Sequence, residues 1–335
     1  MKIAFLNIYS GINNRGAESF SHELAKKLGK NHQVDFFSGK DCNVKIVQPQ
    51  HNRGLLKTFF LDAATISVLR FTLKILPKLG SYDWLIPMNG FWQVLLCKFS
   101  PGKILITGHS GPGWDERWNL YLKPDIFVAT TQPTADWAKK TCFYTKVIII
   151  PYGIDEYKNI TPVNVNLEKP VVLCPAAAVR YKRVDLAIKA VSKMKRGSLL
   201  HLGTGPLLPD LKKLGEELLG KRFLSLTVNY DQMPGFYAAC DVVTLPSSEQ
   251  ENSPMVFLEA MAANKITITT DTPRSRWILG NAGIFIDPTN IVNYSKALIS
   301  GLGSDKKLIK DQVVKYSWDK IIRKYDECFC NNSSL

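Results

Sequence analysis

Short apolar runs alternate along the chain with longer segments whose apolar residues recur at helical spacing. Residues 2–8, KIAFLNI, form the first such run, and residues 17–29, AESFSHELAKKLG, form the first helical pattern, which ends at Gly29. Further strands are predicted at 34–39, 83–88, 103–109, 126–130, 146–151, 171–176, 198–205, 224–229, 241–246, 266–271 and 283–287. This alternation predicts parallel sheets joined by right-handed crossovers.

The alternation stops and restarts around residues 151–170, a Pro- and Asn-rich stretch that we interpret as a hinge. A chain of 335 residues with 45% hydrophobic residues is long enough for about two domain cores. We therefore expect an α/β protein with two Rossmann-like, doubly wound parallel-sheet domains, residues 1–152 and 153–317. Domains of this kind typically bind their ligand at the carboxyl ends of the strands, here in a central cleft that the two domains face.

The segment 54–80 reads as a helical region that is apolar on most sides. We favour a helix that covers the first sheet. The alternative is a patch that lies on a membrane or a lipid acceptor, with basic side chains facing phosphates: Arg53, Lys57, Arg70, Lys74 and Lys78.

The chain has a net charge of +14, and residues 1–150 carry most of it, with 19 Lys and Arg against 10 Asp and Glu. An anionic partner or an ordinary solvated basic face both fit this excess. The seven cysteines are scattered without metal-ligand spacing, which indicates reduced thiols in a cytoplasmic protein. The first strand lacks the features of a signal peptide, and no apolar run reaches 18 residues. Peripheral association with the inner face of the membrane stays open.

Residues 246–261, PSSEQENSPMVFLEAM, contain two carboxylates eight positions apart across a predicted strand-to-helix turn. Ser253 looks like an N-cap with Pro254 at the first helical position, so the free amides of this helix start would form an anion site. Glu259, on the helix, suits the two hydroxyls of a ribose, and Glu251, in the loop, suits the hydroxyls of a second sugar. The simpler interpretation is that these carboxylates are present because negative charge is stabilised near a helix N-terminus.

Several motifs then occur in a fixed order: RGAESFSHELAKKL, IPYGID, VRYKRVDLAIKAV, LGTGPL, FYAACDVVTLPSS, the acid pair with EAMAANK after it, and YSWDKIIRKY. Together they resemble the retaining GT-B glycosyltransferases of family 4 over nearly the whole chain. The resemblance implies a donor-binding second domain, an acceptor-binding first domain, and a last helix, 318–330, that returns towards the first domain.

The resemblance also implies site residues. Lys182 matches the lysine of a cationic pair that holds the donor diphosphate, but the arginine's position is Ala177, so Arg180 or Arg183 is expected to substitute. His109 matches a histidine near the transferred sugar and is assigned to catalysis together with Glu251. Residues 229–233, NYDQM, are expected near the nucleobase. The donor-binding set is Gly16, Arg180, Lys182, Arg183, Gly203, Asn252, Ser253, Pro254, Met255, Val256 and Glu259.

The chain has no D-x-D motif, the carboxylate pair that holds a divalent ion on the diphosphate in metal-dependent enzymes of the other major glycosyltransferase fold. We therefore expect no metal and no cofactor, with a nucleoside diphosphate sugar of the UDP or GDP type as donor substrate. The expected activity is the metal-independent transfer of a hexose-type sugar, with retention, to a glycan, lipid-linked or phosphate-bearing acceptor. In the mechanism implied by the resemblance, the leaving phosphate oxygen takes the acceptor's proton and no protein nucleophile is needed.

Three other classes of protein share single features with this sequence. A dehydrogenase is disfavoured because Gly203-x-Gly205 lacks a third glycine and lies mid-chain. A nucleic-acid-binding protein has only the charge in its favour, and no nucleic acid is expected as a partner. A non-catalytic protein that binds sugar nucleotides or glycans stays open because of Ala177. An anionic membrane surface is a further candidate partner.

Overall fold

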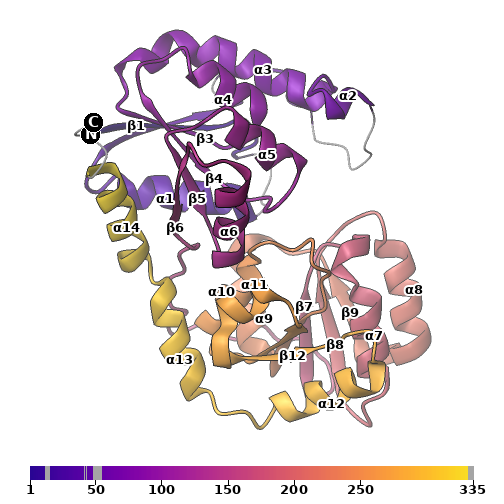
Figure 1. Cartoon of the computed structure of the whole chain (residues 1–335). Coiled ribbons are helices and arrows are strands. Elements are labelled where there is room, and N and C mark those ends of the chain that lie inside the picture. Colours follow the sequence, from indigo (N-terminus) through magenta and orange to yellow (C-terminus); the bar gives the residue numbers. More distant parts are fainter. Residues whose placement is uncertain (12–15, 41, 43, 48–54, 331–335) are drawn as a thin grey trace. The chain divides into compact units, whose positions relative to one another are not determined.

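The computed structural model describes residues 1–11, 16–40, 42, 44–47 and 55–330. The chain divides into two units, one made of Met1–Pro151 with Ile321–Leu335 and the other of Tyr152–Lys320. Each unit contains a six-stranded parallel sheet with helices on its faces (Figure 1). Arg15, the first residue of the motif RGAESFSHELAKKL, and Arg53 lie outside the described residues.

The first unit has the strand order β2-β1-β3-β4-β5-β6. Its strands are β1 (Lys2–Asn7), β2 (Gln33–Ser38), β3 (Trp84–Pro87), β4 (Lys103–Thr107), β5 (Ile126–Ala129) and β6 (Lys146–Ile149). Its helices are α1 (Gly16–Leu28), α2 (Leu55–Thr58), α3 (Ala63–Ile75), α4 (Phe91–Cys97), α5 (Trp114–Tyr121) and α6 (Gln132–Thr141). The strands are apolar on both faces, as helices on both sides of a parallel sheet require.

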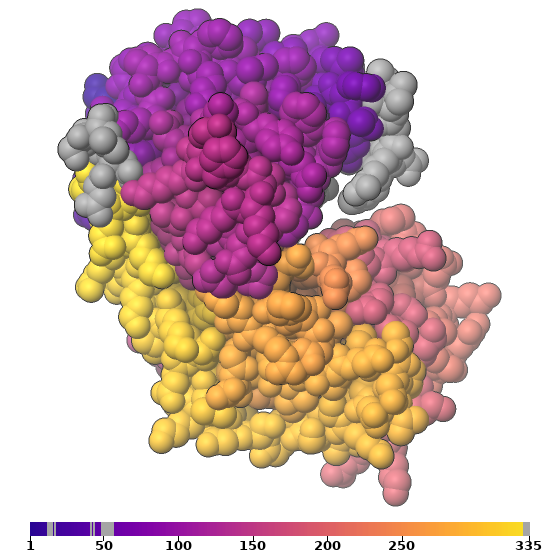
Figure 2. All heavy atoms as spheres, in the orientation of Figure 1, coloured from indigo at the N-terminus to yellow at the C-terminus, as the bar shows by residue number. Residues whose placement is uncertain are grey.

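The last helix is α14 (Trp318–Cys330), and its residues from Ile321 on belong to the first unit. Figure 2 shows the C-terminal part of the chain in yellow. His32 Nε2 lies 2.9 Å from Asp326 Oδ1, and the rings of Trp84 and Phe329 are 5.2 Å apart. These contacts join residues about 250 to 300 positions apart in the sequence. The first unit is therefore completed by the end of the chain.

The second unit has the strand order β12-β11-β10-β7-β8-β9. Its strands are β7 (Val171–Pro175), β8 (Ser198–Leu202), β9 (Phe223–Leu226), β10 (Val242–Leu245), β11 (Thr267–Thr270) and β12 (Gly283–Ile286). Its helices are α7 (Val184–Ser192), α8 (Leu208–Leu219), α9 (Met233–Ala239), α10 (Met255–Ala262), α11 (Pro273–Leu279), α12 (Ile291–Gly301) and α13 (Lys307–Val313). This order is the one typical of the dinucleotide-binding doubly wound fold.

All twelve strands predicted from the apolar runs are present. The stretch 151–170, however, is more than a hinge, because several of its residues pack on the second unit. Tyr157, Val165 and Leu167 lie against the core of that unit, and Val163 N donates to Gly235 O at 3.1 Å. Side chains that pack on a core fix the segment, although its composition is typical of a linker.

The segment 54–80 is interrupted where a single helical region was predicted. Phe60 has a positive φ of 56°, and the carboxylate of Asp62 caps α3 by accepting from Ala64 N at 3.0 Å. The prediction that this segment covers the first sheet is confirmed, because Val68, Phe71 and Ile75 belong to the core cluster of the unit. In the described part of the chain, no helix has the length and apolar character needed to cross a bilayer.

Candidate functional site

In the second sheet the strand order changes direction between β7 and β10, because β8 and β9 follow on one side of β7 and β11 and β12 follow on the other side of β10. In doubly wound sheets, such a switch point is where ligands bind, at the carboxyl ends of the strands. Here Ser248 N, after β10, donates to Tyr181 O, after β7, at 2.8 Å. The two motifs singled out in the sequence thus come together at one place in the second unit.

Lys182 and Glu251 form an ion pair at this edge, with side chains that are 13% and 20% exposed. The sequence motifs predicted a diphosphate as the partner of the lysine and sugar hydroxyls as the partners of the glutamate. In the structure the ammonium group of Lys182 donates to the carboxylate of Glu251, which lies 69 positions further along the chain. An anionic ligand would therefore compete with the Glu251 carboxylate for the lysine.

Arg183 anchors the loop after β10. Its guanidinium donates to Pro246 O at 2.8 Å, to Ser247 O at 2.9 Å and to Thr270 Oγ1 at 3.1 Å. Arg180, by contrast, is exposed on a short 3₁₀ turn, and Ala177 provides no cation at its own position after β7. Of the two arginines proposed to substitute at Ala177, only Arg180 presents an exposed guanidinium.

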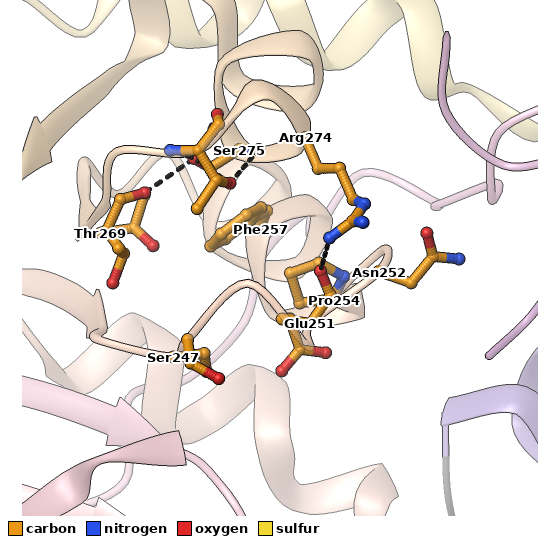
Figure 3. Close-up of a pocket in the computed structure, with 11 residues that line it drawn as sticks. Ser247, Glu251, Asn252, Pro254, Phe257, Thr269, Arg274 and Ser275 are labelled. Carbon is orange, nitrogen blue, oxygen red and sulfur yellow. Dashed lines mark hydrogen bonds between the residues drawn. The ribbon is translucent and has the colours of Figure 1, made fainter. Parts of the chain in front are cut away.

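Arg274 was not selected from the sequence, yet it lines a small polar pocket with Ser247, Glu251, Asn252 and Ser275. In Figure 3 its side chain extends from α11 to the backbone of Glu251, beside Pro254. Its guanidinium donates to Glu251 O at 3.2 Å and also to Glu249 O. Burial lowers the pKa of Arg274. The sequence feature that could have identified Arg274 is its position shortly after the carboxyl end of the predicted strand 266–271.

The helix α10 begins at Met255, so the prediction that Ser253 is its N-cap is wrong. Pro254 occupies the N-cap position with an extended backbone (φ −69°, ψ 123°), and no side chain caps the helix. Proline has no side-chain acceptor, so the N-cap residue does not bond to the first amides of the helix, those of Met255 and Val256. The helix start therefore presents donors beside Asn252 and the Lys182–Glu251 pair, where an anion would be stabilised.

Glu259 is buried on α10, with 3% of its surface exposed. Tyr237 Oη donates to its Oε2 at 2.7 Å, and the hydroxyl of Tyr230 also bonds to the carboxylate. Burial raises the pKa of Glu259, while the two hydroxyl donors act in the opposite direction. A carboxylate has about four acceptor positions, and the two hydroxyls occupy two of them. Tyr230, from the NYDQM stretch, is thus brought to the acid that was assigned to a ribose.

Gly203 follows β8 and lies against the loop after β7. A Cβ on this residue would stand 2.1 Å from Ala176 O, so only glycine allows the two loops to approach so closely. Gly205 has a φ of 155° and packs in the same way on Ala178. The glycine pair that suggested a dinucleotide motif therefore allows the loop after β8 to pack against the loop that carries Lys182.

The first unit holds the other two predicted site residues. Gly16 is the first residue of α1, and His109 follows the carboxyl end of β4. The ring of Phe20, on α1, lies edge-on to the ring of His109, with centroids 5.9 Å apart. The helix that begins at Gly16 and the loop that carries His109 therefore lie at one edge of this unit. Burial lowers the pKa of His109 to about 4, so its imidazole is neutral at neutral pH.

Glu116 is a buried carboxyl that the sequence analysis missed. Its Oε1 accepts from Ser110 N at 3.2 Å and its Oε2 accepts from Asn119 Nδ2 at 3.3 Å. Burial raises its pKa to about 7, although these hydrogen bonds, and one from the backbone of His109, lower it. Glu116 therefore holds the loop that carries His109.

Within the described residues, no group of three or more His, Cys, Asp and Glu side chains is arranged to hold a metal ion. All seven cysteines are free thiols.

The fold matches solved glycosyltransferase structures over the whole chain. HepE from Anabaena, solved in complex with UDP and with UDP-glucose, superposes with a TM-score of 0.74 at 15% identity, over 99% of this chain and 100% of HepE. A sucrose-phosphate synthase from Thermosynechococcus elongatus gives a TM-score of 0.77 at 16% identity, over 99% and 98% of the two chains. At these identities the likeness shows the fold, which is GT-B: two Rossmann-like units, each with its own parallel sheet.

Sequence comparison gives a family match for most of the second unit. Residues 155–313 match the family model of the glycosyl transferases group 1, which is a little under half of the chain. An exopolysaccharide phosphotransferase from Streptomyces coelicolor is 26% identical over 221 residues. That match spans 61% of this chain but only 23% of the relative.

Proposed function

We propose that this protein is a glycosyltransferase that uses a nucleoside diphosphate sugar as donor. The observation that carries the proposal is the grouping, at the switch point of the second sheet, of Lys182, Glu251 and the uncapped start of α10. A cation and free helix amides suit a diphosphate, and a carboxylate beside them suits sugar hydroxyls. The match of residues 155–313 to the group 1 family model supports the same class.

We infer a UDP-type donor first, because HepE was solved with UDP and UDP-glucose. A GDP sugar is the second candidate. In this proposal Glu259 binds the ribose with its two remaining acceptor positions, and Asn252, Met255 and Val256 contact the donor. The positive side chains Lys182 and Arg180 neutralise the diphosphate without a metal ion.

Transfer with retention follows if the leaving phosphate oxygen takes the proton of the acceptor hydroxyl on the same face of the sugar. No protein nucleophile is assigned. For His109 we keep the predicted contact with the transferred sugar, and its lowered pKa makes it a neutral hydrogen-bonding group there. A hexose-type sugar and a glycan or lipid-linked acceptor complete the proposal, together with a cytoplasmic location.

The test is release of nucleoside diphosphate from UDP-glucose and GDP-mannose, with saccharides and lipid-linked oligosaccharides as acceptors. Lys182→Ala should weaken nucleotide binding by roughly tenfold to 150-fold, since a charge-assisted hydrogen bond contributes about 1.5–3 kcal/mol. Lys189→Ala is the matched control, because Lys189 pairs with Asp185 on an exposed helix face.

Thermal stabilisation by a nucleotide sugar without release under any acceptor condition would favour the non-catalytic binding protein instead. The exposed Ala177 is the observation that keeps that second candidate. A wild-type chain that is stabilised by no nucleotide would contradict both.

A further inference from the structure

Three connections enter the amino edge of the first sheet side by side. They lead from α4 into β4, from α5 into β5 and from α6 into β6, which are neighbouring strands. Phe143, Phe99 and Tyr144 lie in them and are 81%, 75% and 67% exposed. Among the large hydrophobic side chains of the described residues, these three are the most exposed. Side chains of this kind concentrated at one edge mark an interaction surface.

Direct contacts join the three connections into one surface. Lys98 Nζ donates to Lys123 O, which links the first connection to the second. Lys123 Nζ lies 4.5 Å from the ring centroid of Tyr144, which links the second to the third. The rings of Phe143 and Tyr144 are 4.0 Å apart. We call this surface, formed by Lys98, Phe99, Lys123, Phe143 and Tyr144, the amino-edge patch.

The amino-edge patch is strongly basic. Four further lysines flank its residues along the chain: Lys103, Lys139, Lys140 and Lys146. The carboxylate within the three connections, Asp125, is engaged by Ile104 N at 2.7 Å. Much of the charge excess of the first 150 residues is therefore collected around three protruding aromatic side chains. The partner of such a surface must be anionic and must also accept apolar rings.

The surface of an anionic membrane meets both requirements. Aromatic rings sit favourably at the level of the lipid headgroups, and lysines near that level are attracted to anionic lipids. The connections at one edge of a parallel sheet end along the same line, so the three tips can reach one plane together. A symmetric contact between two copies would instead bring two basic surfaces face to face, which like-charge repulsion opposes.

We propose that the amino-edge patch docks this protein on membranes that contain anionic lipids. The patch lies at the opposite edge of the sheet from His109, which follows the carboxyl end of β4. It is also separate from the segment 54–80, where the sequence analysis considered membrane contact. The inference goes beyond the proposed transferase activity and does not depend on it.

The experiment is sedimentation of the full chain with phosphatidylcholine vesicles, with and without phosphatidylglycerol. The wild type should bind only the vesicles that contain phosphatidylglycerol, and high salt should release it. The triple variant Phe99→Ser, Phe143→Ser, Tyr144→Ser should lower the partition coefficient at least about tenfold, because ring burial is lost. Replacing Lys139 and Lys140 by Gln should weaken binding and reduce its dependence on salt.

Phe59→Ser is the matched control, because Phe59 is 63% exposed but lies in the segment 54–80. It should leave vesicle binding unchanged. Melting temperatures equal to that of the wild type would show that the variants are folded. Wild-type binding by the triple variant, loss of binding in the control, or no binding of the wild type to phosphatidylglycerol vesicles would each overturn the proposal. If the triple variant keeps vesicle binding but loses self-association, the patch binds a second copy of the chain and the proposal is overturned. If it keeps vesicle binding but loses binding to single-stranded RNA, the partner is RNA and the proposal is likewise overturned.

Discussion

At the scale of single residues, two titratable side chains lie close together after β4. Burial lowers the pKa of His109 to about 4 and raises that of Glu116 to about 7. Both shifts favour the neutral form, as expected where charge is removed from water. The carboxyl of Glu116 also bonds to the loop that carries the histidine. The two groups act on stability in opposite directions as the pH changes.

The signs follow from proton uptake. Glu116 binds its proton more tightly in the folded chain, so its stabilisation is full below pH 4.5 and is lost as the pH rises through about 7. His109 binds its proton less tightly when folded, so its stabilisation is present above pH 6.5 and is lost as the pH falls through about 4. In the wild type the two effects partly offset each other.

The Glu116→Gln variant should remove one side of this balance. Its free energy of unfolding, relative to the wild type, should rise by up to about 3 kcal/mol between pH 4.5 and 7. Urea unfolding at a series of pH values measures this difference. Glu23→Gln, the same substitution at a partly exposed glutamate on α1, is the control. Parallel curves for Glu116→Gln and the wild type would show that Glu116 does not titrate as inferred.

At the scale of elements, the loop between β10 and α10 is held at both ends by arginines from other elements. Arg183, at the start of α7, donates to Pro246 O and Ser247 O. Arg274, on α11, donates to Glu249 O and Glu251 O. Glu251 is therefore positioned by its backbone as well as by Lys182. Neither arginine is near this loop in sequence.

Removal of one of these anchors should loosen the loop without unfolding the unit. Arg274→Ala should weaken nucleotide binding about tenfold, because hydrogen bonds from a charged group contribute about 1.5–3 kcal/mol and part of this orders Glu251. Arg274→Lys should restore binding only in part, since lysine lacks the planar fork of donors. Isothermal titration with UDP measures both.

Arg276→Ala is the matched control for that experiment. Arg276 lies on the same helix but is exposed, and it pairs with Asp271 at the surface. Equal nucleotide affinity in Arg274→Ala and Arg276→Ala would show that the backbone contacts of Arg274 do not order the site.

The elements also show where sequence patterns are sufficient. Every strand was predicted, because apolar runs of four to eight residues between turn signals mark a buried parallel strand. The start of α10 was placed at the wrong residue, because Ser-Pro fits an N-cap followed by proline as well as it fits an extended pair. The choice depends on the backbone of Pro254, which the surrounding loop fixes.

At the scale of the whole molecule, the proposed chemistry needs positive charge at the carboxyl edge of the second sheet. Lys182, Arg180 and the amides of α10 supply it there. UDP binding and the release of nucleoside diphosphate from the donor should therefore be unchanged by EDTA. Thermal stabilisation at a fixed UDP concentration, with and without EDTA and Mg²⁺, measures this through the coupling of binding to unfolding. Loss of stabilisation in EDTA, with recovery on adding Mg²⁺, would contradict the metal-independent mechanism.

The sequence by itself determined the two sheets and the stretch that carries Glu251 and Glu259. These follow from local features, namely the period of apolar residues and the turn residues between them. The tertiary structure alone decided which groups meet: Lys182 with Glu251, Tyr237 with Glu259, and Arg274 with the acid loop. These contacts span 22 to 69 positions and join residues on different helices and loops. Only the order of strands in the sheet and the paths of the loops bring them together, and neither is encoded in a local pattern.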